Sequence, residues 1–296
     1  MKGLLSRLKH MAPASAPDAL AGDPSSDLRA VLRAWKAHTK KYQQLKLLGA
    51  QKLIETYIVQ KCVAGFSIDF LIATVEAKSW WDAPSCPYDI ELLRQLRMIR
   101  PGDVVFDLGA NHGFYALIFA NLVGPEGRVY AFDPFPVNAD LIRFNSRLNR
   151  MDIEVFEVGL SNEQKTVQAS LGSQNINATD SADSLPIRLD KLDNYAHLRP
   201  DFIKIDIEGA EIDALQGAQR LLEHRPNLYI EVHTSFFKAF GRRLEELFDY
   251  LPLEDYLCFI SHPGYEWARP YTSDVEIKEH CTLFLTREEP VRRVYL

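Results

Sequence analysis

The sequence predicts an α/β fold in which helices cover both faces of a mostly parallel sheet, preceded by an N-terminal extension. Three observations support this prediction. After Pro101, short apolar runs alternate with stretches of helical length, which is typical of successive βαβ units. A glycine-rich turn at residues 109–113 follows the first of these runs, where open α/β sheets bind their ligands. The composition, with 47% hydrophobic and 25% charged residues, is that of a globular chain and excludes wholesale disorder.

The chain divides into three parts by composition and pattern. Residues 12–26 are rich in Ala, Pro and Ser without any period, so residues 1–26 are predicted to form a flexible lead. Residues 27–100 are predicted to form a mainly helical extension with a short strand segment. Residues 101–296 are predicted to form the ligand-binding domain.

Local patterns predict the elements of the extension. Apolar residues at helical spacing predict a helix with Asp27 as its N-cap, and a second helix is predicted over residues 42–60. Residues 66–75 are apolar and β-branched, which predicts one or two strands. A helix over residues 89–99 is expected to stop at the Arg-Pro-Gly sequence of residues 100–102.

Strands and helices alternate in the predicted ligand-binding domain. The predicted strands are residues 104–106, 128–132, 153–158, 202–207, 228–232, 256–260 and 282–285. The predicted helices are residues 114–123, 137–148, 210–222 and 242–251. Residues 161–190 are polar and interrupt this order, with weak strand candidates at 166–171 and 186–189. They are predicted to leave the edge of the sheet and to lie near the active site.

Charge, cysteine content and hydropathy exclude several classes of protein. The net charge of −6 argues against a nucleic-acid backbone as the main partner. The four cysteines lie far apart without a C-x-x-C pair, which argues against a zinc ribbon and a disulfide framework. No apolar run approaches the ~20 residues of a membrane span, and the first residues lack the pattern of a signal peptide. A cytoplasmic protein is therefore expected.

The glycine-rich turn has the pattern D-x-G-x-x-x-G, formed by Asp107, Gly109 and Gly113. Gly109 permits a tight turn and a close approach of a ligand, and Gly113 permits close packing of helix on strand. Asp107 places a carboxylate where a dinucleotide-binding protein would hold a diphosphate. This arrangement suits a ligand with an ammonium group, although a turn of purely structural role has the same pattern.

A second acidic residue, Asp133, ends the second predicted strand, 26 residues after Asp107. In Rossmann-like folds an acidic residue at this place binds the vicinal hydroxyls of a ribose. A helix N-cap is the structural alternative for Asp133. Together, the turn and Asp133 predict a site for a nucleoside.

Charged residues gather at the ends of two later strands. Lys204, Asp206 and Glu208 share one face of the fourth strand, although a central parallel strand is normally apolar on both faces. Such departures are typical of functional sites, and an ion pair of Lys204 with a carboxylate is the structural alternative. Glu231 and His233 lie two residues apart at the end of the next strand. His233 is therefore a candidate general base or metal ligand, or else a structural histidine.

The succession of these motifs resembles the FkbM-type family of S-adenosylmethionine-dependent methyltransferases. The resemblance covers roughly residues 100–260, with DLGANHG, AFDPFP, a Gly-Leu-Ser turn, Leu189-Asp190, DFIKIDIEGAE and IEVH as its motifs, of which KIDIEGAE is the most specific. It implies the class I methyltransferase fold, a Rossmann-like sheet of seven strands with residues 282–285 as its one antiparallel strand. It also implies O-methylation of a hydroxyl on a sugar, glycan or natural product.

The resemblance also implies which residues bind S-adenosylmethionine. The methionine end is assigned to Asp107, Gly109, Asn111 and Gly113, the ribose to Asp133, and the adenine to Gly159 and Leu160. Members of the family often carry Glu where this chain has Asp133, and the shorter side chain is expected to reach a ribose hydroxyl.

For the chemistry we expect in-line methyl transfer to a small-molecule or glycan acceptor. His233 is the expected general base, oriented by Glu231, and Asp206 is expected to place the acceptor hydroxyl. With an ordinary histidine pKa, turnover should rise near pH ~6.5. A variant is a divalent metal held by Asp206, Glu231 and His233 that acidifies the hydroxyl.

Two other classes of protein remain as alternatives. An NAD-dependent oxidoreductase is disfavoured because the G-x-G-x-x-G pattern is missing and Asp107 takes the place of the diphosphate. A catalytically idle binding module with the same fold is disfavoured because Asp206, Glu231 and His233 are all present.

Overall fold

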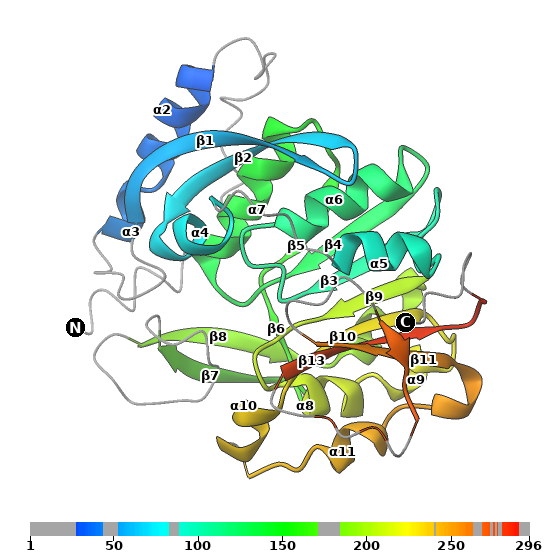
Figure 1. Cartoon of the computed structure of the whole chain (residues 1–296). Helices are drawn as coiled ribbons and strands as arrows, with labels where there is room; N and C mark the ends of the chain where they lie inside the picture. Colours follow the sequence, from blue (N-terminus) through cyan, green and yellow to red (C-terminus); the bar gives the residue numbers. More distant parts are fainter. Residues whose placement is uncertain are drawn as a thin grey trace.

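The computed structural model describes residues 28–43, 53–82, 89–170, 184–239, 241–262, 268–272, 275, 277 and 280–289. The predicted lead, residues 1–26, lies outside the described residues. The strands of the central sheet are β3 (Val104–Leu108), β4 (Arg128–Phe132), β5 (Ile153–Phe156), β9 (Phe202–Ile205), β10 (Asn227–His233), β11 (Leu257–Ser261), β12 (Arg269–Pro270) and β13 (His280–Thr286). They lie in the order β12-β11-β13-β10-β9-β3-β4-β5 (Figure 1).

The central sheet confirms the predicted class I methyltransferase fold. Strands β5, β4, β3, β9 and β10 run parallel to one another, and β13 inserts antiparallel between β10 and β11. The short β12 pairs antiparallel with β11 at the edge. The antiparallel strand predicted at residues 282–285 is β13. The two-residue β12 adds a short eighth strand at the edge beyond the seven expected.

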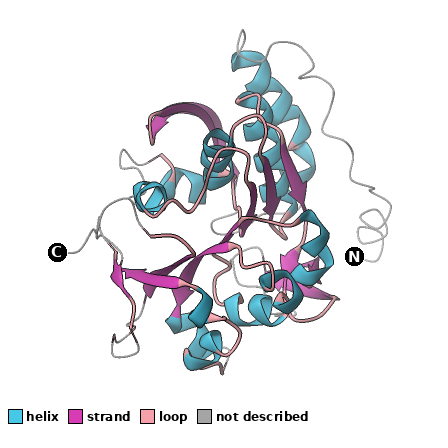
Figure 2. Ribbon diagram, turned by 90° about the vertical axis from the view of Figure 1, so that its right-hand side faces the viewer, coloured by secondary structure: helices cyan, strands magenta, loops and turns pink. Residues whose placement is uncertain are grey.

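Helices cover both sides of the sheet. Figure 2 shows helices above and below the central strands. One side carries α5 (Asp89–Gln95), α6 (Phe114–Val123) and α7 (Pro136–Leu148), and the other carries α8 (Glu211–Gln216), α9 (Gln219–Leu222) and α11 (Glu245–Phe248). The remaining short helices are η4 (Leu192–Leu198), α10 (Thr234–Ala239) and η5 (Leu253–Asp255). Parallel strands buried on both faces explain why β9 and β3 are almost continuously apolar.

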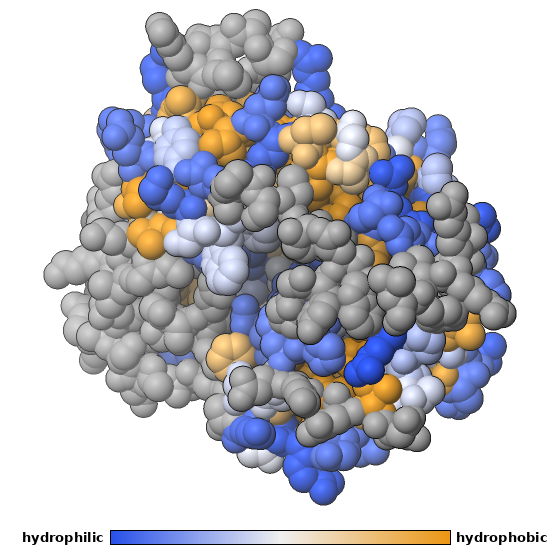
Figure 3. Space-filling view, in the orientation of Figure 1, coloured by the Kyte–Doolittle hydropathy of each residue, from blue (hydrophilic) through white to orange (hydrophobic). Residues whose placement is uncertain are grey.

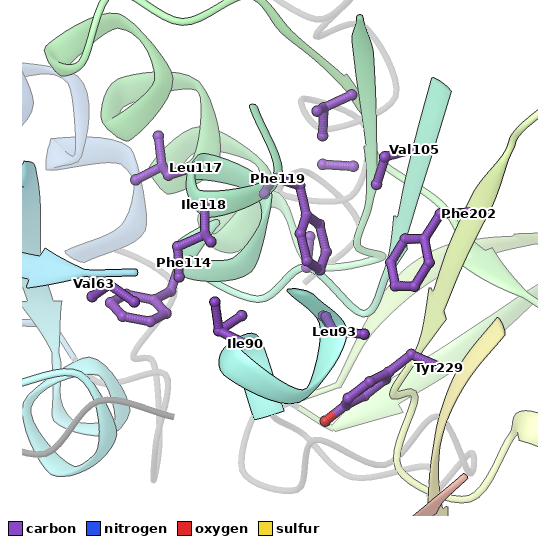
Figure 4. Packing of buried hydrophobic residues seen from close by; sticks show 14 of the residues in the cluster. Val63, Ile90, Leu93, Val105, Phe114, Leu117, Ile118, Phe119, Phe202 and Tyr229 are labelled. Atoms are coloured by element: carbon purple, nitrogen blue, oxygen red, sulfur yellow. The ribbon is translucent and has the colours of Figure 1, made fainter. Parts of the chain in front are cut away.

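Helix α6 is buried because apolar residues occupy every face of the helix. Phe114, Leu117, Ile118 and Phe119 are each at most 2% exposed, and α5 packs against the same cluster through Ile90 (Figure 4). At about 25 cal/mol per Å² of apolar surface, such aromatic and branched side chains supply much of the stability of this layer. This packing fixes the N-terminus of α6 at the ligand edge of the sheet.

Three predicted helices are shorter in the structure than in the sequence pattern. The helix predicted over residues 89–99 ends at Gln95 as α5. The helix predicted over residues 210–222 is broken at Gly217 into the separate helices α8 and α9. A Cβ on Gly217 would lie 2.2 Å from the Ser161 carbonyl oxygen, so glycine lets the two backbones approach at the break. The helix predicted over residues 242–251 is reduced to α11.

The extension contradicts the prediction of a helix over residues 42–60. Residues 53–63 instead form strand β1 (Leu53–Val63), which pairs antiparallel with β2 (Phe66–Thr74), the strand that the sequence did predict. Residues 53–59, LIETYIV, form a strand because they are rich in β-branched and aromatic side chains, which favour strands. Ala64 and Gly65 both have positive φ, 52° and 85°, as a two-residue hairpin turn requires.

The hairpin of β1 and β2 docks on α7 through two asparagines one helical turn apart. Asn145 Oδ1 accepts a hydrogen bond from Leu71 N at 2.9 Å, and Asn149 bonds both backbone groups of Asp69. Helix α2 (Leu28–His38) completes the contact, with the Trp35 ring 4.9 Å edge-on from that of Phe144. The remaining helices of the extension are α3 (Lys40–Gln43) and α4 (Val75–Trp80).

A small second sheet occupies the predicted excursion. Its strands are β6 (Gly159–Leu160), β7 (Lys165–Ser170) and β8 (Ser184–Asp190), in the order β6-β8-β7 (Figure 1). The weak strand candidates at residues 166–171 and 186–189 correspond to β7 and β8. The remainder of the excursion, residues 171–183, lies outside the described residues.

Among the described residues, no helix is both long and apolar enough to cross a membrane. Figure 3 shows hydrophobic residues in separate patches among hydrophilic ones on the face of Figure 1.

Phe70→Ala should lower the free energy of unfolding by about 3–5 kcal/mol, because the buried ring packs edge-on against Phe114 of α6 at 5.5 Å. Urea unfolding followed by circular dichroism measures this. Ser67→Ala on the exposed side of the same strand is the control and should change the value by less than about 0.5 kcal/mol. An unchanged midpoint for Phe70→Ala would show that the hairpin unfolds separately from the domain.

Candidate active site

An open cleft lies at the carboxyl ends of β3, β4 and β9, and the space in it, counted together with its opening to solvent, is about 760 Å³. This is the edge at which parallel α/β sheets bind ligands. The cleft is lined by Trp81, Gly109, Ala110, Asn111, Tyr115, Phe132, Asp133, Pro134, Phe135, Asn138, Val158, Gly159, Leu160, Lys204, Asp206, Ile207 and Glu208. These residues come from the extension, from four strand ends and from the turns that follow them.

The glycine-rich turn crosses from β3 to α6 in a left-handed conformation. Gly109 has φ 77° and Asn111 has φ 52°, and the N–H groups of Gly109 and Ala110 both donate to the Phe132 carbonyl at 3.0 Å. A Cβ on Gly109 would lie 1.8 Å from the carbonyl oxygen of Asp206. Glycine is therefore required here both by backbone conformation and by the close approach of the next strand.

Asp133 lies at the end of β4 and is 4% exposed. Its carboxylate accepts hydrogen bonds from Asn111 N at 3.0 Å, Phe135 N at 2.9 Å and Asn138 Nδ2 at 3.2 Å. Burial raises its pKa to about 7 against the opposing effect of these donors. Asp133 thus holds the turn together and also lines the cleft. The N-cap of α7 is Phe135, so the interpretation of Asp133 as the N-cap is wrong, and its binding of a ribose stays a prediction.

A buried ion-pair network lies beside the cleft. Lys204 Nζ lies 2.9 Å from Asp206 Oδ2 and 3.7 Å from Asp107 Oδ1, and it sits 4.8 Å from the centre of the Tyr115 ring. The Tyr115 hydroxyl donates in turn to Asp89 at the start of α5, at 2.7 Å. The ion pair of Lys204 offered as a structural alternative is present, and it forms part of the cleft wall.

Protonation in this network follows from burial and from mutual pairing. Burial alone would lower the pKa of Lys204, but Asp206 and Asp107 together raise it above its usual value. Burial raises the pKa of Asp107 to about 6, although Lys204 opposes the change. For Asp206 burial also raises the pKa, but Lys204 and His233 outweigh burial and hold the carboxyl pKa below its usual value. At neutral pH Lys204 and Asp206 are a charged pair.

A second cluster of charged residues lies at the end of β10. His233 Nδ1 lies 3.0 Å from Glu211 Oε1, and His233 Nε2 lies 3.6 Å from Glu208 and 3.9 Å from Glu231. Glu231 instead bonds His280 of β13 at 2.6 Å. Glu211, at the start of α8, thus orients the His233 ring, whereas the sequence had assigned this role to Glu231.

The surrounding carboxylates change the titration of this cluster. Although burial lowers the pKa of His233, Glu211, Asp206 and Glu208 together raise it to about 9. Burial and the nearby Asp206 raise the pKa of Glu208 to about 7. His233 therefore carries its proton at neutral pH, which differs from the expected ordinary value of ~6.5. Glu208 and Asp133 are thus the two described carboxyl groups in the cleft lining whose pKa is raised to about 7.

Some of the predicted site residues line the cleft and others do not. Gly109, Asn111, Asp133, Gly159, Leu160 and Asp206 line the cleft. Asp107 is fully buried beneath Lys204, and Gly113 packs against α7, where a Cβ on Gly113 would lie 3.3 Å from Ile142, so neither lines the cleft. Glu231 and His233 lie behind Asp206 and Glu208, without lining the cleft themselves.

Sequence reasoning missed several residues that the structure places at the site. Glu208 was visible on the charged face of its strand but was not assigned a role. Glu211 and His280 contact the cluster from a helix and a strand distant in sequence, and only the tertiary structure shows this. Trp81 and Glu76 come from the extension, where the sequence carried no recognisable motif, and Glu76 accepts a hydrogen bond from Asn111 Nδ2 at 2.6 Å.

The lining of the cleft fits S-adenosylmethionine. Phe135, Val158 and Leu160 form an apolar end next to Asp133, which suits an adenine followed by a ribose. In the glycine-rich turn, Asn111 Oδ1 is a buried acceptor without a hydrogen-bond partner among the described residues. An unpaired buried polar atom costs free energy, and the ammonium of the methionine part is a donor that would satisfy it. Which residues bind which part of the cofactor stays a prediction.

The fold and the cleft define a class I S-adenosylmethionine-dependent methyltransferase. The family described as Methyltransferase FkbM domain matches residues 107–258, from the end of β3 into β11. The chain belongs to this family. The match decides for a methyltransferase over the NAD-dependent oxidoreductase that the sequence left open.

Relatives carry methyltransferase names. The chain is 25% identical over 179 residues to hexuronic acid methyltransferase AglP of Haloferax volcanii, covering 58% of this chain and 72% of that protein. It is 43% identical over 65 residues to 31-O-demethyl-FK506 methyltransferase FkbM of Streptomyces tacrolimicus, covering 22% of this chain and only 25% of that protein. The solved structure of methyltransferase FkbM from Methylobacillus flagellatus KT is 18% identical, with a TM-score of 0.42, covering 68% of this chain and 55% of that one.

Gly109→Ala should abolish folding or lower the free energy of unfolding strongly, because the added Cβ would overlap the Asp206 carbonyl. The loss should be several times the ~1–2 kcal/mol that the left-handed backbone conformation alone costs an alanine. Gly102→Ala is the matched control, since Gly102 also has positive φ, 90°, in the turn closed by Asp103 N and Arg100 O, but nothing lies within 4 Å of its Cβ position. Thermal unfolding of the two variants compares them. Equal losses would mean that strand β9 does not approach the turn this closely.

Asp133→Ala should weaken binding of S-adenosylhomocysteine by roughly 10- to 150-fold, because charge-assisted hydrogen bonds to the ribose are lost. Isothermal calorimetry measures the affinity, and the melting temperature shows whether the turn survives the loss of its three internal hydrogen bonds. Asp152→Ala, at an exposed position, is the control. Unchanged affinity in a folded Asp133→Ala protein would sink the ribose assignment.

Proposed function

We propose that the protein transfers a methyl group from S-adenosylmethionine to a hydroxyl of a sugar, glycan or natural product. The observation that carries this proposal is the carboxyl group of Glu208 at the cleft, next to Asp206 and backed by His233. An alcohol must lose its proton as it attacks, so a proton acceptor beside the methyl donor is the feature that O-methylation needs. The names of the relatives AglP and FkbM fit an acceptor of this class.

The protein has mainly to position the acceptor. When bound, S-adenosylmethionine supplies a methyl group already activated by its sulfonium. Holding the hydroxyl in line with that group supplies about 7–11 kcal/mol of the barrier reduction. Asp206, held in place by Lys204 at 2.9 Å, is the group at the cleft that accepts a hydrogen bond from the hydroxyl and fixes its direction.

The proton passes to Glu208 in this proposal. Glu208 lines the cleft, and its backbone is in the left-handed region with φ 54°, which directs the residue out of the strand end. Asp206 is a weaker base, because Lys204 and His233 lower its pKa. His233, as a cation 3.6 Å from Glu208, positions that carboxylate rather than accepting the proton. The assignment of the base to His233, made from the sequence, stays a prediction that the same experiments test.

Electrostatics favour a neutral hydroxyl over a carboxylate as the acceptor. Asp206, Glu208, Glu211 and Glu231 gather at this edge around the cations Lys204 and His233, and only part of their charge is paired. An anionic acceptor entering this low-dielectric edge would be repelled, whereas a hydroxyl finds hydrogen-bond acceptors. In a uronic acid, the methylated position is therefore expected to be a hydroxyl.

The metal variant has a geometric basis of its own. In the described part of the chain, two groups of three residues have ligand atoms within 4.8 Å of one another, namely Glu231, His233 and His280, and Asp206, Glu208 and His233. Glu211 bonds His233 Nδ1, so that Nε2 of the same ring faces the carboxylates of both groups. Metal-binding histidines commonly have such a carboxylate on their other ring nitrogen. The set expected from the sequence, Asp206, Glu231 and His233, is divided between the two groups.

Glu208→Gln should lower turnover by about 10²–10⁴-fold and leave the affinity for S-adenosylhomocysteine within about threefold, because the side chain acts on the acceptor. Labelled S-adenosylmethionine, offered with neutral glycans, uronic-acid glycans and polyketides, identifies the acceptor by the mass of an added methyl group. Turnover of the wild-type protein should rise with pH through about 7 as Glu208 ionises. Glu126→Gln, at an exposed turn, is the control variant.

His233→Gln separates the two candidate bases. If Glu208 accepts the proton, loss of the neighbouring cation raises its pKa, so the pH profile should shift upward with a smaller fall in the plateau. A wild-type profile rising only through about 9, with His233→Gln reduced by about 10²–10⁴-fold, would instead make His233 the base. Activity lost with EDTA and restored by Mn²⁺ or Mg²⁺ would establish the metal variant. Tight cofactor binding without transfer to any acceptor would support the idle binding module.

A further inference from the structure

Trp81, from the extension, presents an unsatisfied hydrogen-bond donor at the cleft. Its side chain lines the cleft, yet its indole Nε1 is buried and has no hydrogen-bond partner among the described residues. An indole nitrogen can only donate, and leaving a buried donor unpaired costs about 1–3 kcal/mol. Buried polar groups in folded proteins are nearly always paired, so Trp81 points to an acceptor that the described part of the protein does not supply.

The ring of Trp81 is fixed rather than free to turn toward solvent. It stacks on Phe114, the first residue of α6, with ring centres 4.6 Å apart and planes at 13°. It also meets the rings of Tyr115 and Phe70 edge-on, at 6.1 Å and 6.4 Å. Its backbone N–H donates to the Ala77 carbonyl and closes α4, the helix that follows β2 (Figure 1). The hairpin and α6 therefore hold the indole in one orientation.

Trp81 lies beside the glycine-rich turn, because its ring stacks on Phe114, the residue that directly follows Gly113. Its ring neighbour Tyr115 carries Lys204 Nζ 4.8 Å from its ring centre, and Glu76 of α4 bonds the Asn111 side chain. Asn111 belongs to the turn assigned to the methionine part of the donor. The donor N–H of Trp81 and the cation of Lys204 thus both border the region where the amino-acid part lies.

We propose that Trp81 Nε1 donates a hydrogen bond to the α-carboxylate of the methyl donor, and that the extension thereby contributes to cofactor recognition. The inference rests on the proposed use of S-adenosylmethionine in this cleft. The amino-acid part offers an ammonium and a carboxylate, and only the carboxylate accepts. The acceptor substrate is the other source of an oxygen atom, and a ligand without the carboxylate separates the two.

The test combines a variant with a truncated ligand. Trp81→Phe keeps the stack on Phe114 but removes the N–H, and Trp80→Phe next to it, 68% exposed, is the matched control. Calorimetry compares S-adenosylhomocysteine with its analogue lacking only the carboxylate, 5′-(3-aminopropylthio)-5′-deoxyadenosine, on each protein. The melting temperature checks that Trp81→Phe is folded.

Trp81→Phe should bind S-adenosylhomocysteine at least about tenfold more weakly, while its affinity for the analogue stays at the wild-type value. Trp80→Phe should bind both ligands as the wild type does. Equal weakening for both ligands in Trp81→Phe, or no weakening for either, overturns the proposal. Failure of the wild-type protein to bind S-adenosylhomocysteine would instead contradict the cofactor assignment, so the two failures are distinguishable.

Discussion

The buried ion pairs of Lys204 with Asp107 and Asp206 constrain the rest of the site. Lys204 and Asp107 are register partners on adjacent parallel strands, and Lys204 is 2% exposed. Burying one such charge without its partners costs several kcal/mol, so the register of β3 and β9 and the ionisation of all three groups are linked. Because Asp206 is tied to Lys204, its backbone also takes the position that leaves no room for a side chain at residue 109.

The extension is part of the same site. Asn145 of α7 accepts from β2 through its Oδ1 and donates through its Nδ2 to the His112 carbonyl in the glycine-rich turn, at 2.9 Å each. Thr74, at the end of β2, bonds the buried His112 ring at 3.1 Å, and burial lowers the pKa of that ring to about 3. The histidine is therefore neutral and structural. These contacts explain how residues without a recognisable motif come to line a cofactor cleft.

The proposed acceptor edge, formed by Asp206, Glu208, Glu211 and Glu231, differs in its electrostatics from the proposed cofactor end at Phe135, Val158 and Leu160. The cofactor end combines apolar walls with a few directed polar atoms, as small-molecule sites do. The acceptor edge instead concentrates carboxyl groups around His233 and Lys204. Burial raises the pKa of Glu208 to about 7, whereas Lys204 and His233 outweigh burial at Asp206 and keep its pKa below the usual value. Separation of pKa values between neighbouring carboxyl groups is how one site provides both a proton acceptor and a fixed anion.

The sequence by itself determined the central sheet, because apolar runs and glycine turns are short-range signals. Helix α6 and strand β4, for example, begin and end where their patterns predict. It also singled out Asp133 and Asp206, because strand ends in a parallel sheet converge at one edge. It misjudged residues 53–60, where strand formation depends on pairing with β2. Only the tertiary structure decided that Glu211 holds His233 and that Trp81 reaches the cleft, because these contacts join distant segments whose spacing carries no local pattern.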